Sequence, residues 1–217
     1  EGIQGQGQPK KRLIKSMEFD IKKLVFTLVA ALTLSVFANA YAALQNAPSI
    51  QATLSEAEST KLIFMREEEK LARDVYLRFA EMYPEQDVFS SIATRSEQTH
   101  KDTIRDRLKQ FNLADPNPDT NNLPDSLGVF TGEEWGWYFT EKFTELTKIG
   151  AENELAALYV GAFIEELDMH DITDCPQVMV DAGYSDPCGL EHTDEKALIN
   201  AYRSLIDGSE NHLRAYV

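Results

Sequence analysis

Two polar residues lie on the apolar face of a segment that has the periodicity of an amphipathic helix. The apolar positions of residues 87–111 recur at helical spacing and form one stripe. Glu97 and His100 fall in the middle of this stripe, and their spacing puts both side chains on the same face of the helix. A carboxylate and an imidazole on a core-facing surface need partners, because burying an unpaired polar group costs free energy. The fold therefore has to bring other polar groups to Glu97 and His100.

Apolar residues recur at helical spacing in four long segments. The long helices are predicted at about residues 55–82, 87–111, 152–172 and 194–216. Ser55 and Glu58 have the spacing of a capping box at the start of the first helix. A shorter, aromatic-rich helix is predicted at about 133–148. Since no stretch shows sustained strand alternation, we predict an all-α domain over residues 54–217. The long connection between the second and third helices contains the short helix and permits a crossover, as in ferritin-like four-helix bundles.

The other three long helices also carry acidic or histidine side chains on their apolar stripes. Carboxylates and imidazoles that meet in a core are costly unless they are protonated or paired with a cation. A pair of divalent metal ions bridged by carboxylates would neutralise them. The predicted ligand set is Glu68, Glu97, His100, Glu165, Asp168 and His212. Second candidates for the same site are Glu69, Glu166 and Ser209.

This set departs from the usual two-metal plan of a helical bundle. In that plan two helices each supply a Glu and the other two each supply Glu-x-x-His. The second helix has the full Glu97-x-x-His100 motif, whereas the fourth helix has Ser209 where the plan expects Glu. Asp168 is the predicted replacement. Taken singly, each residue has a plainer explanation: the acidic run at 67–69 is a solvated face, and each histidine is a satisfied core residue. The coincidence on four helices favours a metal site.

The N-terminal part of the chain has the pattern of a targeting segment. Lys22 and Lys23 precede an apolar run of about 14 residues, and small residues follow it. The run is short for a membrane span, which needs about 20 residues. We therefore expect a signal peptide at 17–42, preceded by a disordered extension at 1–16. The protein would be exported to the periplasm or the extracellular space, without stable membrane insertion after cleavage. An uncleaved membrane anchor is the alternative.

The charge distribution argues against one class of partner. The chain has a net charge of −15, and because residues 1–40 contribute +3, residues 41–217 carry −18. Nucleic-acid binding depends on Lys and Arg side chains that neutralise phosphates. So acidic a domain is not expected to bind nucleic acid, whereas it suits the binding of cations.

The chain has two cysteines, Cys175 and Cys188, which share one predicted loop. In an exported protein, such a pair is a candidate disulfide. Free thiols and metal ligands are weaker alternatives, because neither cysteine has a histidine or a second cysteine at ligand spacing.

Four sequence blocks together carry a resemblance to a known family. They are Arg66-Glu67-Glu68-Glu69-Lys70-Leu71-Ala72-Arg73-Asp74-Val75-Tyr76, Ser96-Glu97-x-x-His100, Gly161-Ala162-Phe163-Ile164-Glu165-Glu166-x-Asp168 and Gly208-Ser209-x-Asn211-His212-Leu213-Arg214-Ala215-Tyr216. In order and content they resemble the ferritin-like family called domain of unknown function 2202, over about residues 54–217. The resemblance implies a ferritin-like or rubrerythrin-like bundle with a dinuclear metal centre. It also implies that Ser209 belongs to the pattern of the family.

The expected cofactor is a pair of divalent metal ions, with iron favoured and manganese or zinc as alternatives. A di-iron centre would make the protein an oxidoreductase of the peroxidase or ferroxidase type. Tyr76, Tyr159 and Tyr202 are candidate redox neighbours, although plain packing is the commoner explanation for a tyrosine at each of these positions. Since the sequence has no Cys-x-x-Cys module, electrons would come from an external donor.

Two other functions are compatible with the same residues. One is a non-catalytic periplasmic protein that binds or sequesters metal, and the other is a structural bundle. The Ser at position 209 puts ferroxidase chemistry of the ferritin kind in question. A homodimer is compatible with the sequence.

Overall fold

The computed structural model describes residues 53–118, 126–184 and 188–217. Residues 51–217 form one compact unit. The expected signal peptide at 17–42 and the extension at 1–16 lie outside the described residues. The regular structure of the described residues is entirely helical, so the all-α prediction is confirmed. None of the described helices has the length and hydropathy that crossing a membrane requires.

The long helices begin and end close to their predicted positions. They are α2 (Glu56–Met82), α4 (Gln98–Gln110), α5 (Gly136–Gly150), α6 (Glu154–Thr173) and α8 (Lys196–Tyr216). The predicted second helix is composite, because the short α3 (Asp87–Ser91) continues into α4 through a π-helical segment, η1 (Ile92–Glu97). Two short elements were not predicted. They are α7 (Gln177–Asp181) and the 3-10 helix η4 (Leu190–His192), and both lie between α6 and α8.

Polar side chains cap the starts of two long helices. The Ser55 hydroxyl accepts a hydrogen bond from the backbone of Glu58, and the Glu58 carboxylate accepts one from the backbone of Ser55. The predicted capping box of α2 is therefore confirmed. Asn153 caps α6 in a similar way by accepting a hydrogen bond from the N–H of Ala156. These contacts satisfy N–H groups that have no partner inside the helix.

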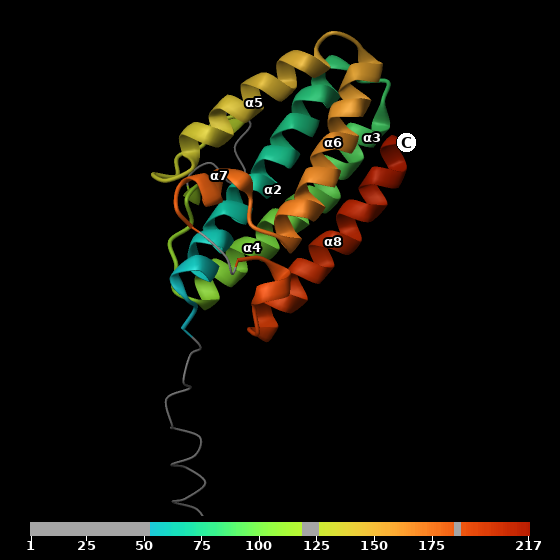
Figure 1. The fold of residues 1–217 in the computed structure, drawn as a ribbon. Helices are drawn as coiled ribbons and strands as arrows, with labels where there is room; N and C mark the ends of the chain where they lie inside the picture. The colour runs from blue at the N-terminus through green and yellow to red at the C-terminus, as the bar shows by residue number, and fades with distance from the viewer. Residues whose placement is uncertain (1–52, 119–125, 185–187) are drawn as a thin grey trace, which may run out of the picture. The chain divides into compact units, whose positions relative to one another are not determined.

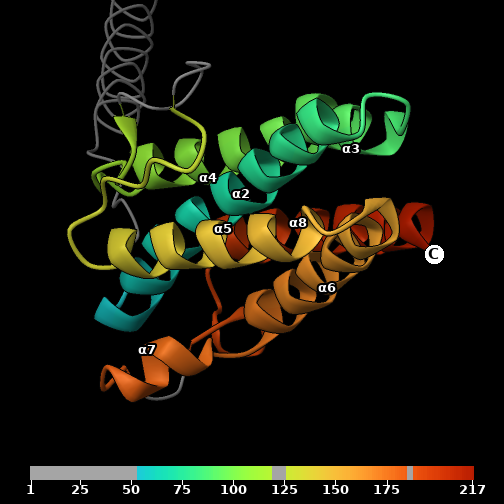
Figure 2. The ribbon, with the colours of Figure 1, turned by 90° about the horizontal axis from the view of Figure 1, so that it is seen from above.

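The long helices pack in two pairs, α2 with α4 and α6 with α8. The pairs face each other through contacts of α2 with α6 and of α4 with α8. Helix α5 lies against α2 and α6, as Figure 1 and Figure 2 show from two directions. The interior between the two pairs is therefore lined by four long helices, which is where the predicted ligands point.

Contacts between helix ends establish the direction of each helix. Tyr83, which follows α2, donates to the carbonyl of Gly150 at the end of α5, and Gln86 donates to Glu154 at the start of α6. Thr193, which precedes α8, donates to Glu58 near the start of α2. Helices α2, α5 and α8 thus run one way, while α4 and α6 run the other way. The connection that contains α5 returns along the length of this unit (Figure 1), as the predicted crossover requires.

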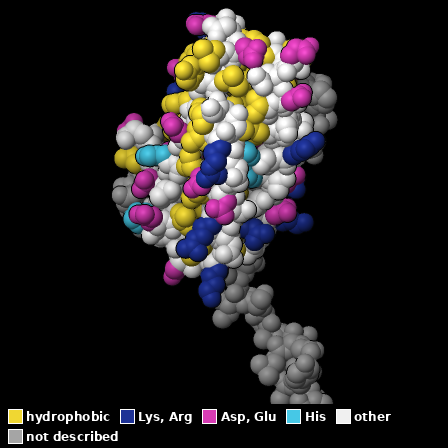
Figure 3. Space-filling view, turned by 90° about the vertical axis from the view of Figure 1, so that its right-hand side faces the viewer, with side chains coloured by type: hydrophobic (Ala, Val, Ile, Leu, Met, Phe, Trp, Pro, Cys, Tyr) yellow, Lys and Arg dark blue, Asp and Glu magenta, His cyan; other side chains and the backbone are white. Residues whose placement is uncertain are grey.

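Helix α6 packs against α2, α5 and α8 at once, so a wide face of it is covered. Val160 and Ile164 are buried on this face, whereas Leu155 in the first turn is 60 % exposed. Tyr159 and Phe163 are exposed on the same helix. Hydrophobic side chains also form a band among acidic and basic ones on the face that Figure 3 shows.

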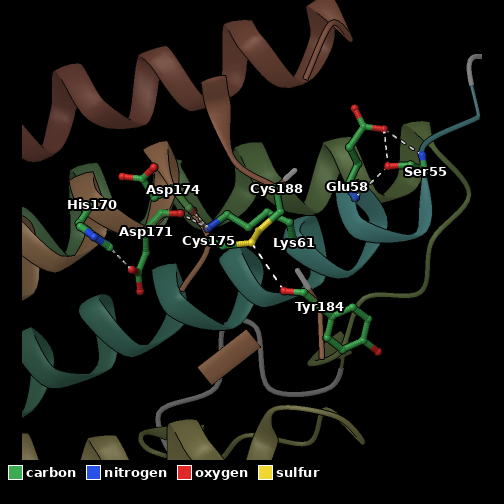
Figure 4. Close-up of a disulfide and its surroundings, with 9 residues drawn as sticks. All are labelled: Ser55, Glu58, Lys61, His170, Asp171, Asp174, Cys175, Tyr184 and Cys188. Carbon is green, nitrogen blue, oxygen red and sulfur yellow. Dashed lines mark hydrogen bonds and ion pairs between the residues drawn. A yellow bond between two sulfur atoms is a disulfide. The ribbon is translucent and has the colours of Figure 1, made fainter. Parts of the chain in front are cut away.

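The connection between α6 and α8 is fastened to itself and to α2. A disulfide joins Cys175 to Cys188, whose Cα atoms are 5.2 Å apart. The buried ammonium of Lys61 in α2 donates hydrogen bonds to the backbone carbonyls of Asp171 and Asp174 (Figure 4). The end of α6 is thereby held against the first turns of α2.

Candidate metal centre

Acidic and histidine side chains from α2, η1, α4, α6 and α8 converge in the interior of the domain. None of them is more than 6 % exposed. We call this group the candidate centre, and its members are Glu68, Glu69, Glu97, His100, Glu165, Asp168 and His212. It contains the six side chains of the predicted ligand set together with Glu69.

Glu97 lies between the two imidazoles of the candidate centre. His212 Nδ1 is 2.8 Å from Glu97 Oε1, and His100 Nδ1 is 3.5 Å from Glu97 Oε2. The two rings are stacked, with their centroids 5.3 Å apart. One potential ligand atom from each of these three residues lies within 4.8 Å of the other two. Ligand atoms this close together suit a metal site.

Two further carboxylates face the same imidazole nitrogens. Glu69 Oε2 is 3.4 Å from His100 Nδ1, and Glu165 Oε2 is 3.2 Å from His212 Nδ1. Each histidine therefore directs its Nδ1 atom at two carboxylates, one of which is Glu97. Nδ1 is accordingly the nitrogen that each ring presents to the interior of the centre.

Hydrogen bonds hold these side chains in place. The Tyr76 hydroxyl donates to Glu165 Oε1 at 2.6 Å, and the Ser96 hydroxyl is 2.6 Å from His212 Nε2. Partners of this kind orient a ligand and select which histidine nitrogen is free to bind. From the sequence, Tyr76 was a candidate redox neighbour or a packing residue, and Ser96 had no assigned role. Neither contact has a signal in helical periodicity, because each depends on packing between two helices.

Asp168 contacts Ser209, the residue that stands where the usual two-metal plan expects a Glu. The Ser209 hydroxyl donates to Asp168 Oδ2 at 2.6 Å and to the carbonyl of Leu205. The short side chain on α8 thus faces the carboxylate on α6. Of the second candidates, Glu69 lies in the centre, Ser209 contacts it through Asp168, and Glu166 is exposed outside it.

The acidic run on α2 is not a solvated face. Glu67 is buried and accepts a hydrogen bond from Asn117, and the buried Lys70 is paired with Asp74. The plainer explanation of this run is therefore wrong. Every residue of it is covered, because α2 is enclosed by α4, α5 and α6.

Four of the five carboxyl groups of the centre, all except that of Glu97, have raised pKa values. Burial, together with the negative charge of Glu97, raises the pKa of Glu165 to about 7 and that of Asp168 to about 6. Burial and neighbouring acids raise the pKa values of Glu68 and Glu69 well above the ordinary range. A group of acids that resists ionisation in this way lacks compensating positive charge.

The pKa values of the two imidazoles and of Glu97 shift in the directions that favour the charged form of each group. Burial works against the charged form of Glu97, but hydrogen bonds with His100 and His212 lower its pKa to about 2. Burial also works against protonated His100, but the charge of Glu69 outweighs it and raises the pKa of His100 to about 12. Hydrogen bonds with Glu165 and Glu97 raise the pKa of His212 to about 9. Protonated histidines thus supply part of the positive charge that the acids require.

Three buried oxygens of the centre have no donor among the described residues. They are Glu68 Oε2, Glu69 Oε1 and Asp168 Oδ1. A buried acceptor without a donor costs free energy. Carboxylate oxygens combined with imidazole nitrogens are ligands for divalent iron, manganese and zinc. The donor set of the candidate centre therefore fits such ions.

Glu97 is the last residue of the π-helical segment η1. Single widened turns of this kind occur often at functional sites. The sequence predicted an uninterrupted helix over 87–111, and the prediction was wrong about the π-helical turn. Apolar periodicity over so many residues does not report one turn of different pitch.

Helix α8 approaches His100 closely at Gly208. A Cβ atom added to Gly208 would overlap the imidazole of His100. The glycine thus leaves room for the ring beside Ser209, and its neighbour in sequence contacts Asp168.

Comparisons with known proteins bear on the same region of the chain. The family described as "Uncharacterized protein domain (DUF2202)" matches residues 58–217. Uncharacterized protein MJ0754 of Methanocaldococcus jannaschii is 39 % identical over 164 residues, which cover 76 % of this chain and 75 % of that protein. No solved structure gives a significant match. The match over residues 58–217 includes every side chain of the candidate centre, and the chain belongs to the DUF2202 family.

Proposed function

We propose that this protein is an exported, ferritin-like protein that binds a pair of divalent metal ions, with iron favoured, at the candidate centre. The observation that supports this proposal is that five carboxyl groups and two imidazoles meet in one buried place in the interior of the domain. Three of the carboxyl oxygens have no donor among the described residues. Two divalent cations would compensate this negative charge and would take up the unpaired oxygens of Glu69 and Asp168.

The helix arrangement supports the ferritin-like part of the proposal. In ferritin-like folds, four helices pack around a metal site, and one long connection crosses the bundle between the second and third helices. Here α2, α4, α6 and α8 are the four helices, and the connection that contains α5 is the crossover.

The contacts suggest how the ligands would be shared between two ions. Glu97 contacts both imidazoles and would help to hold both ions. Glu69 would join His100, and Glu165 would join His212. The contact with His100 favours Glu69 over Glu68 as the ligand from α2. Asp168 would take the place of the Glu that position 209 lacks.

A bound pair of iron ions would supply redox chemistry with dioxygen or peroxide, of the peroxidase or ferroxidase type. The residues of the chain would position that chemistry and shield it. Tyr76 orients Glu165, Ser96 holds His212 with Nδ1 toward the carboxylates, and burial keeps bulk water away. An external electron donor would be required for turnover by a reductive reaction.

Metal binding without turnover is the second candidate function. The observation that favours it is Ser209, which replaces one carboxylate of the usual plan and contacts Asp168 instead. A periplasmic sequestering protein would need the affinity of the centre but none of its reactivity.

The experiment that separates these functions begins with metal analysis of the purified protein. The iron(II)-loaded protein is then mixed with hydrogen peroxide without air, and in a second reaction it is exposed to air, each time with an added chemical reductant as the electron donor. Repeated oxidation and reduction with consumption of peroxide or dioxygen supports the oxidoreductase, whereas stoichiometric metal that never changes valence supports sequestration. A double variant, Glu97→Ala with His100→Ala, should lose the metal. Retention of metal by this variant would contradict both functions.

Export is supported by the disulfide, since disulfides persist in oxidising compartments. Expression of the full chain and of a form without residues 17–42 tests it. The full chain should appear outside the cytoplasm with Cys175 and Cys188 oxidised. Cytoplasmic accumulation of both forms would contradict export.

A further inference from the structure

A cavity of about 580 Å³ opens between α2, α5 and α6. Its volume lies within the range of about 300–1,000 Å³ that small-molecule sites occupy. The walls are mainly aliphatic and aromatic, and the buried side chains that form them are Leu71, Ala72, Phe139, Leu146, Val160 and Ile164. Apolar walls of this extent favour the apolar part of a ligand.

Two carboxyl groups of the candidate centre form part of the same cavity wall. Glu68 and Asp168 both line the cavity, and each is only 5 % exposed. Glu68 Oε2 and Asp168 Oδ1 have no hydrogen-bond donor among the described residues. Asp168 is also held by Ser209 of α8 from the opposite side. The cavity wall and the candidate centre therefore share these two carboxyl groups, and their unpaired oxygens require a donor.

The mouth of the cavity has a different character. Tyr159 and Phe163 of α6 and Ile149 of α5 line it and are exposed. Lys142 and Glu145 also line it, and their side chains pair with each other at 3.0 Å. The paired charges at the mouth offer no unbalanced charge to a ligand. Inside the cavity, the polar groups that could contact a ligand are the two carboxyl groups and the hydroxyl of Tyr138, which also lines the cavity.

From these observations we infer that the cavity binds an elongated, neutral aliphatic molecule whose one polar end donates a hydrogen bond to Glu68 or Asp168. A hydroxyl group has the required donor, and an aliphatic chain suits the walls. A carboxylate at the same end would have to give up its water among apolar walls, and its burial there would be unfavourable. Where the proposed metal function holds, on which this part of the inference rests, the polar end would lie beside the metal ligands.

The test uses calorimetric titration of the full domain with 1-octanol and with sodium octanoate. The metal-free protein should bind one octanol per chain, and octanoate should bind at least about tenfold more weakly, because burying its charge among apolar walls is unfavourable. Glu68→Leu removes one of the two hydrogen-bond acceptors and should weaken octanol binding. Equal binding of octanol and octanoate by the unmodified protein would overturn the inference.

A matched pair of substitutions locates the binding. Ala156 lines the cavity at the start of α6, and Ala151 is exposed just after α5 and does not line it. Ala156→Trp should fill the cavity and weaken octanol binding at least about tenfold, while Ala151→Trp should leave it unchanged. Octanol binding that survives Ala156→Trp would place the ligand elsewhere and overturn the inference.

A second copy of the chain is the competing occupant of this surface. Sedimentation of the protein at several concentrations checks it, with Tyr159→Asp as the disrupting variant. A dimer that dissociates on this change and binds no octanol would overturn the inference.

The metal proposal fails separately from this inference. Protein that binds octanol but no metal would contradict only the metal function. Protein that binds cobalt with no octanol binding would contradict only the cavity ligand. Where both bind, octanol should perturb the visible spectrum of the cobalt-loaded protein.

Discussion

Glu97 is the residue on which the other members of the centre depend. It contacts His100 and His212, and those contacts lower its pKa to about 2 although burial opposes ionisation. The sequence placed this residue on the buried face because it lies at mid-stripe in a long periodic segment. It could not distinguish Glu68 from Glu69, since adjacent residues differ by about 100° around a helix and both fall within a wide buried face.

Replacing Glu97 by Gln tests its role as a ligand. Gln keeps the shape of the side chain but removes the charge, so metal affinity should fall by more than about tenfold, the usual effect of losing even an outer partner of a ligand. Competition with a chelator of known affinity measures the change. Glu166→Gln removes an exposed carboxylate from the adjacent helix and should have no effect. Equal losses in the two variants would point to general charge and not to ligation.

Ser209→Ala tests the support of Asp168. The change removes a hydrogen bond of 2.6 Å to a buried carboxyl group, so the unfolding free energy should fall by about 1 kcal/mol. Metal affinity should also fall, because Asp168 is no longer oriented. Urea unfolding and metal titration measure the two effects. The control is Ser204→Ala, an exposed serine on the same helix, and an equal response of both variants would remove Ser209 from the centre.

The titrating groups predict a stability that falls with rising pH in the metal-free protein. The pKa of Glu165 rises from 4.5 to about 7 and that of Asp168 from 3.8 to about 6, so between these values the folded chain holds protons that the unfolded chain has lost. Stability therefore decreases through this window as pH rises. His212, raised from 6.5 to about 9, continues the decrease above neutrality. Glu97 acts only below pH 4.5, where its stabilising effect is lost as pH falls toward 2.

Thermal unfolding between about pH 5 and about pH 8 measures this dependence. The metal-loaded protein should lose little stability over the same range, because bound ions take the place of the protons. Parallel pH profiles for the metal-free and metal-loaded forms would count against the centre as a metal site.

The helices illustrate what periodicity can and cannot predict. The ends of α2, α6 and α8 fell within a few residues of expectation, because capping residues and breakers mark them. The π-helical turn η1 and the short α7 and η4 were missed, because each depends on tertiary contacts and not on local pattern.

The connection between α6 and α8 provides a prediction at this scale. Its disulfide joins cysteines 13 residues apart, and loops of that size are stabilised by about 3 kcal/mol through the entropy of the unfolded chain. Cys175→Ser with Cys188→Ser should lower the unfolding free energy by about that amount, measured in urea. Metal affinity should hold, since the bridge is not part of the centre. Adding a reductant to the unmodified protein should reproduce the loss, and no loss in either case would show that the bridge does not stabilise the fold.

Across the domain as a whole, the connection that contains α5 brings the side chains of α2, η1 and α4 to those of α6 and α8 in the candidate centre. It makes α4 and α6 run in the same direction, so that Glu97 and His100 meet side chains from α6 and α8. The sequence predicted this from the length of the connection, and it predicted the residue types that would meet. It could not predict the apolar cavity, whose walls come from three helices that are distant in sequence.

The most direct test of the proposed centre is a crystal structure of iron-loaded protein with anomalous data collected at the iron absorption edge. Two anomalous peaks should appear among the side chains of the candidate centre, in contact with Glu97, His100 and His212 and with the carboxylates beside them. Anomalous peaks only at the surface, with none among these side chains, would contradict the proposal that this domain is built around a pair of metal ions.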